Sequence, residues 1–76
     1  MELQDFIKHF AEQFDETDES EFTAETEFRE LDEWSSLISL GITGMVDEEY
    51  GVALMGADFR KADTIEDLFN IVKSKL

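Results

Sequence analysis

The chain has 76 residues, 42% of them apolar, which is enough for one small hydrophobic core and too much for a disordered tail. Twenty Asp and Glu residues against six Lys and Arg give a formal net charge of −14, which excludes nucleic acid and anionic membrane surfaces as partners and favours basic protein surfaces. The absence of Cys excludes disulfides and thiolate chemistry. We therefore expect a single domain over residues 1–76.

Nothing in the sequence predicts membrane insertion or export. No segment reaches the roughly 18 apolar residues of a membrane span. Met1 leads directly into "ELQDFIKHF", which lacks the basic start and the apolar stretch of a signal peptide. We therefore expect a cytoplasmic protein, and we expect it to be a monomer.

Residues 2–15 have the spacing of an amphipathic helix. Apolar side chains recur at i, i+3, i+4 and i+7, which places them on one helix face. These side chains are Leu3, Phe6, Ile7, Phe10 and Phe14. Glu2 and Asp5 lie near the start, where the helix dipole favours anions. We predict that this helix packs its apolar face on the core.

Residues 16–34 are predicted to form a long connection. From Glu12 to Glu33 the chain holds 11 acidic residues and one base, Arg29, and like charges at this density disfavour a free helix. Four apolar residues are spaced through the connection, and we interpret them as anchors that hold it on the core. They are Phe22, Phe28, Leu31 and Trp34. A connection of this length in a compact domain is often functional.

Residues 36–50 should form the second long helix. The positions predicted to face inward are Leu37, Leu40, Met45 and Val46. Gly41 and Gly44 remove side chains from this helix, so another surface could approach it closely. Gly51 suits a helix end that needs a left-handed residue.

The last third of the chain contains two further helical segments. Residues 57–62, "ADFRKA", are predicted to form one short helix, and "TIED" matches a capping box in which Thr64 caps and Asp67 reaches back. The apolar face of the last helix would comprise Ile65, Leu68, Phe69, Val72 and Leu76. Without any strand pattern, the sequence predicts an all-α fold: a small four-helix bundle of three long helices and one short helix, with a long loop after the first.

Two serines open a run without charged side chains, from Trp34 to Val46. A serine nucleophile needs a base, but the single histidine, His9, lies on the first predicted helix, and "EWSSLIS" lacks the Gly-x-Ser-x-Gly elbow. We therefore predict no catalytic residue. Ser35 is instead placed to cap the helix and Ser36 to be its first residue, where free N–H groups and the dipole favour an attached or bound phosphate.

In this setting the chain resembles the acyl carrier proteins. That family has a four-helix bundle with a long first loop, and the serine of its Asp-Ser-Leu motif opens the second helix and carries a 4′-phosphopantetheine arm. Here "WSSL" stands at that place, so Ser36 rather than Ser35 matches the modified serine and Leu37 matches the leucine. "EFRELDEW", "DEEYGV" and "ADTIEDLFNIV" also resemble the flanking segments. Ser35 replaces the usual Asp, and the positions after the serine lack the family's acidic residues, which indicates a specialised carrier.

The resemblance implies a carrier that catalyses nothing itself. A phosphopantetheinyl transferase would attach the arm to Ser36, and its thiol would hold acyl groups for enzymes of fatty-acid or related lipid or polyketide synthesis. An acyl chain could fold back between the helices against Phe6, Phe28, Leu40, Met45, Val46, Leu54, Ile65 and Phe69. Acyl-processing enzymes with basic docking surfaces would contact Leu37, Ile38, Met45, Asp47, Glu48 and Glu49.

Other interpretations of the sequence stay open beside this one. An aminoacyl or peptidyl carrier would have the same fold. An acidic mimic of nucleic acid fits the charge but gives the uncharged run around Ser36 no purpose. The run 15–26 is not an EF-hand, because Ser20 stands where the loop needs Gly and Thr26 where it needs a bidentate Glu. We therefore predict no metal site, although loose binding of divalent cations along this loop is not excluded.

Overall fold

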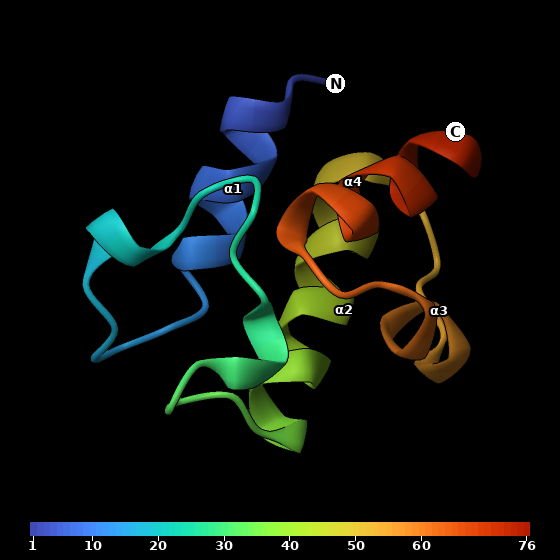
Figure 1. Cartoon of the computed structure of the whole chain (residues 1–76). Helices are drawn as coiled ribbons and strands as arrows, with labels where there is room; N and C mark the ends of the chain where they lie inside the picture. The colour runs from blue at the N-terminus through green and yellow to red at the C-terminus, as the bar shows by residue number, and fades with distance from the viewer.

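The chain folds into four α-helices and two short 3-10 turns, with no β-strand (Figure 1). In the computed structural model, which describes residues 1–76, the helices are α1 (Leu3–Ala11), α2 (Ser36–Tyr50), α3 (Gly56–Lys61) and α4 (Ile65–Ser74). The 3-10 turns are η1 (Glu19–Glu21) and η2 (Phe28–Glu30), both between α1 and α2. The prediction of an all-α fold is confirmed. None of the helices combines the length and the apolar character needed to cross a bilayer.

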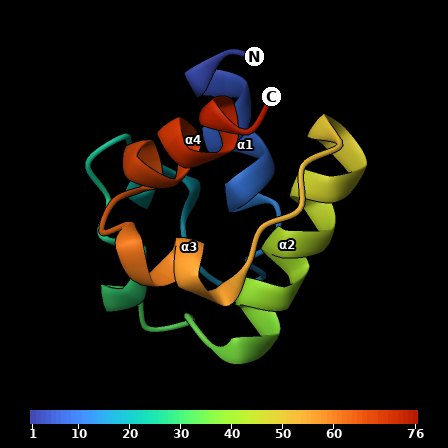
Figure 2. The same cartoon turned by 90° about the vertical axis from the view of Figure 1, so that its right-hand side faces the viewer.

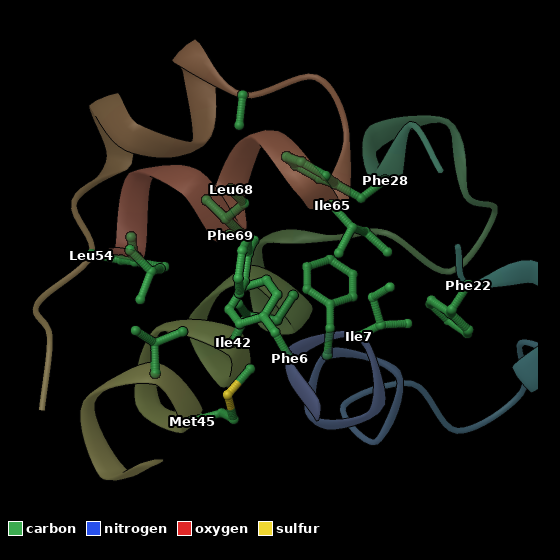
Figure 3. Packing of buried hydrophobic residues seen from close by; sticks show 14 of the residues in the cluster. Phe6, Ile7, Phe22, Phe28, Ile42, Met45, Leu54, Ile65, Leu68 and Phe69 are labelled. Atoms are coloured by element: carbon green, nitrogen blue, oxygen red, sulfur yellow. The ribbon is translucent and has the colours of Figure 1, made fainter. Parts of the chain in front are cut away.

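Helix α1 presents the apolar face that its spacing predicts. Phe6 and Phe10 are fully buried, and Ile7 is 9% exposed. The helix ends at Ala11, earlier than predicted, but the Phe14 N–H donates to the Ala11 carbonyl at 3.0 Å in a tighter turn that keeps Phe14 buried. Figure 3 shows Phe6 beside Phe69 of α4, and their ring centroids lie 5.7 Å apart. Aromatic packing thus joins the first helix to the last.

Helix α2 begins and ends as predicted, but it turns a different face to the core. Gly51 follows its last residue with φ 65°, the left-handed conformation expected of it. Leu37 is 77% exposed and Leu40 is 67% exposed, so the prediction that they face inward is wrong. The buried residues of the helix are Ile42, Met45 and Val46. Apolar side chains occur on more than one side of this helix, and its contacts with α1 select the side that is buried.

The long connection between α1 and α2 is held on the core by its aromatic residues. Phe22 and Phe28 are buried, while Leu31 and Trp34 are partly buried against the same core, so the prediction that these four act as anchors is confirmed. Trp34 lies 4.9 Å from Phe28 between ring centroids and also contacts Phe10 and Phe14 of the α1 segment. The acidic residues of the connection other than Glu33 are exposed, while these rings pack against the core.

Glu33, near the end of this connection, binds the residues at its start. Its carboxylate accepts hydrogen bonds from the Asp15 N–H at 2.8 Å, the Glu16 N–H at 3.0 Å and the Thr17 hydroxyl at 2.8 Å. These bonds, with that of Asp15 foremost, hold the pKa of Glu33 below its ordinary value of 4.5. An acidic side chain thus stabilises an acidic loop by binding its backbone.

The start of α4 contains the predicted capping box and is joined to the first connection. The Asp67 N–H donates to Thr64 Oγ1 at 3.1 Å, and the Thr64 N–H donates to the Asp67 carboxylate at 3.1 Å. The Ile65 N–H also donates to the Thr26 carbonyl at 3.0 Å. Four residues predicted for the apolar face of α4 are buried, but Leu76 lies beyond the helix end and is 66% exposed, so its predicted position is wrong.

The two faces of α2 give a direct test of this packing. Ile42→Ala should lower the free energy of unfolding by about 2–5 kcal/mol, because Ile42 is fully buried and its truncation leaves a cavity. Leu40→Ala, a matched truncation on the exposed face, should change it by about 0.5 kcal/mol or less. Urea denaturation followed by circular dichroism measures both. Equal losses in the two variants would contradict the observed orientation of α2.

The contribution of Glu33 should depend on pH. Because its pKa is lower in the folded chain than in the unfolded chain, the carboxylate stabilises the fold fully above pH 4.5, and this contribution is lost as pH falls further through the folded-state value. Glu33→Gln should therefore be less stable than the unmodified sequence at pH 7, and the difference should shrink below pH 4.5. Thermal unfolding of both proteins across this range measures the difference, and a constant difference would contradict the assigned role.

Candidate functional site

Ser35 and Ser36 have separate positions and separate roles at the start of α2. Ser35 is the N-cap, with an extended backbone, and its hydroxyl accepts a hydrogen bond from the Ile38 N–H at 3.2 Å. Ser36 is the first helical residue and is exposed, and its hydroxyl has no hydrogen-bond partner in the protein. Both positions are as predicted. The Ser35 hydroxyl accepts from a free N–H group of the first helical turn, so the Ser36 hydroxyl is not needed for capping.

No histidine base lies near this hydroxyl. His9 contacts Glu12 at 3.5 Å and Glu49 at 3.8 Å, and Glu49 is at the opposite end of α2 from Ser36. With a rise of 1.5 Å per residue, thirteen helical residues separate the two ends by about 20 Å. The Ser36 hydroxyl therefore has no histidine within hydrogen-bond reach.

A groove of about 540 Å³ opens beside Ser36, and it is the largest of five hollows on the molecule. It lies between the start of α2, the segment before it and α3, which approach one another in Figure 2. Its lining residues are Arg29, Trp34, Ser35, Ser36, Ser39, Gly56, Phe59 and Arg60. The groove thus combines serine hydroxyls, two aromatic rings and both arginines of the chain, and it contains no carboxylate.

The residues predicted to surround an acyl chain are mostly packed core. Phe6, Phe28, Met45, Val46, Leu54, Ile65 and Phe69 belong to one buried cluster, part of which is drawn in Figure 3. None except Met45 lines any of the five hollows. Leu40 does not belong to this set, because α2 turns it to solvent. A chain could enter this region only by displacing packed side chains.

The predicted partner-binding residues are divided between surface and core. Asp47, Glu48 and Glu49 are exposed near the end of α2, and Leu37 is exposed near its start. Ile38 is partly buried. Met45 is only 8% exposed and packs in the core, so its prediction as a partner contact is wrong. Leu40, predicted to face inward, joins Leu37 one turn away as an exposed apolar side chain instead.

Sequence reasoning missed the groove residues Ser39, Phe59 and Arg60. They lie on α2 and α3, and only the fold brings them together with Trp34 and Ser36. The one signal in the sequence was that the chain has only two arginines, which here line the same groove. The acidic loop contains no group of three His, Asp or Glu side chains that could hold a metal ion.

No protein-family model, characterised protein or solved structure matches the chain. The chemistry open to Ser36 is set by the features around it. These are a free hydroxyl, an independent cap and a neighbouring groove with cationic and aromatic walls.

The two serines should differ in their effect on stability. Ser35→Ala removes the hydroxyl that accepts from the Ile38 N–H, and the loss of such a cap costs about 0.5–2 kcal/mol of unfolding free energy. Ser36→Ala removes an exposed hydroxyl without a partner and should change stability by about 0.5 kcal/mol or less. Urea denaturation of the unmodified proteins measures both. A larger loss for Ser36→Ala would contradict the assignment of the cap.

Proposed function

We propose that the chain is an acyl carrier protein and that Ser36 is the attachment site of its 4′-phosphopantetheine arm. The observation that carries this proposal is the free, exposed Ser36 hydroxyl at the first position of α2, beside a cap that does not depend on it. When bound, the arm supplies a terminal thiol that holds acyl groups as thioesters, a chemistry that a chain without Cys cannot supply.

The element order supports the same proposal. A first helix of nine residues, a long connection, a second helix that opens at the serine, a short third helix and a final helix have the element order of that family. The residues present also fit the arm. Ser36 offers the oxygen for a phosphodiester, and Arg60 in the adjoining groove offers a positive charge beside it.

The loading reaction assigns Ser36 one chemical role. Its Oγ would attack a phosphorus atom of the coenzyme A pyrophosphate and form the new P–O bond, while the bond to the adenosine 3′,5′-bisphosphate leaving group breaks. The hydroxyl proton would pass to a base of the phosphopantetheinyl transferase, since the chain has no histidine within reach of Ser36. The chain contributes an accessible oxygen on a rigid helix.

The surface of α2 supports docking of acyl-processing enzymes. Leu37 and Leu40 offer exposed apolar contacts close to Ser36, and Asp47, Glu48 and Glu49 offer negative charge toward the far end. A partner with a basic docking surface would be attracted by the net charge of −14 and positioned by the apolar contacts.

Intact mass spectrometry tests the attachment. The protein co-expressed with a broad-specificity phosphopantetheinyl transferase should gain the mass of one arm, and peptide fragmentation should place it on Ser36. Ser36→Ala should abolish the gain. Ser35→Ala should keep it, because this change removes the cap and leaves the reacting hydroxyl in place.

Two outcomes would contradict the proposal. One is a chain that stays unmodified while a known carrier protein in the same cells is modified. The other is an arm found on Ser35, Ser39 or any residue other than Ser36.

A further inference from the structure

The groove beside Ser36 is the one hollow on this protein that suits an anion. Each of the other four hollows is lined by at least two acidic residues. The groove has none, although 20 of the 76 residues are acidic, and it holds both arginines. In a chain of net charge −14, such a site is the place where a negative group meets least repulsion.

The two arginines are not equally available. The Arg29 guanidinium donates to the Phe59 and Ala62 carbonyls and pairs with Asp63 at 2.8 Å, so its donors serve the fold. Arg60 is exposed and makes no hydrogen bond or ion pair within the protein. Among the other polar side chains of the groove, the Ser35 hydroxyl caps α2 and the Ser39 hydroxyl donates to the Ser36 carbonyl at 2.8 Å. Arg60 is therefore the one positively charged side chain of the groove that has no partner within the protein.

We propose that Arg60 binds the phosphodiester that joins the arm to Ser36, so that the groove between α2 and α3 is an anion site for the arm itself. This inference rests on the proposed function. Ser36 and Arg60 line the same groove, and the phosphorus atom would be bonded directly to Ser36 Oγ. A guanidinium offers planar, paired donors that match phosphate oxygens.

The aromatic residues of the groove strengthen this pairing. Trp34 and Phe59 lie 6.1 Å apart between ring centroids and form its apolar part. Apolar walls lower the local dielectric constant, so a charge-assisted hydrogen bond beside them is stronger than one in open water. The first part of the arm would thus lie along α3, and its direction away from Ser36 would be set by Arg60.

Nuclear magnetic resonance of the modified protein with a free thiol tests this site, because no cargo is then present. In the unsubstituted protein, attachment of the arm should shift the Arg60 Nε–H signal and the α3 amide signals as well as those of residues 35–39. In Arg60→Gln the α3 shifts should disappear, while those of residues 35–39 remain. Lys61→Gln removes the same charge from the next residue of α3, outside the groove, and should keep both sets.

The possible results separate this inference from the proposed function. Modification without any shift at Arg60, or with equal shifts in Arg60→Gln, overturns the phosphodiester site and leaves the carrier function intact. Shifts at Arg60 that appear only after loading with a malonyl group assign the guanidinium to a cargo carboxylate and also overturn it. A chain that the transferase leaves unmodified overturns both. Circular dichroism of Arg60→Gln, an exposed substitution, should match that of the unsubstituted protein.

Discussion

The Arg29 side chain joins the acidic connection to the end of α3 and the two residues after it, and it lines the same groove as Ser36. Its guanidinium binds two carbonyl groups, those of Phe59 and Ala62, and the Asp63 carboxylate. It also lies 5.2 Å from the centre of the Phe28 ring, on the core side of η2. Helix α3 has only six residues and could not hold its own position by burial alone. Arg29 holds α3 on the connection together with the Phe59 ring, which packs against Phe28 and Trp34, and these contacts form one side of the groove.

The fold reconciles a net charge of −14 with a small core because the acid-rich segments also contribute buried aromatic residues. Rings from α1, the connection and α4 make a continuous cluster, so each segment with many acids is held by an aromatic residue that it contributes. Several carboxylates also serve the backbone. Glu33 binds N–H groups of the first turn after α1, Asp58 accepts from the Met55 N–H, and Asp67 accepts from the Asp63 and Thr64 N–H groups. Acids that stabilise local turns offset part of the repulsion between acids.

Features encoded within a few residues were predictable, and features that depend on distant segments were not. The spacing of Phe6 and Phe10, the left-handed Gly51 and the box of Thr64 with Asp67 are local signals, and the structure confirms each. The buried face of α2 was mispredicted because apolar residues occur on several of its sides, and only the positions of the other helices decide between Leu40 and Ile42. The places of Ser35 and Ser36 followed from the helix start. The groove could not be predicted in the same way, because Arg60 comes to it only in the folded chain. There Arg29, 31 residues earlier in the sequence, binds the end of α3.

The serine at position 35 has a consequence beyond capping. Asp and Ser are about equally good N-caps, so helix stability alone does not favour one over the other. They differ in charge, and residue 35 lines the groove beside Ser36. An Asp there, as in the motif that this segment resembles, would place a carboxylate in the one hollow that has none. Ser35 caps α2 through its hydroxyl without adding negative charge to the groove, so one residue accounts both for the helix start and for the absence of a carboxylate at this position.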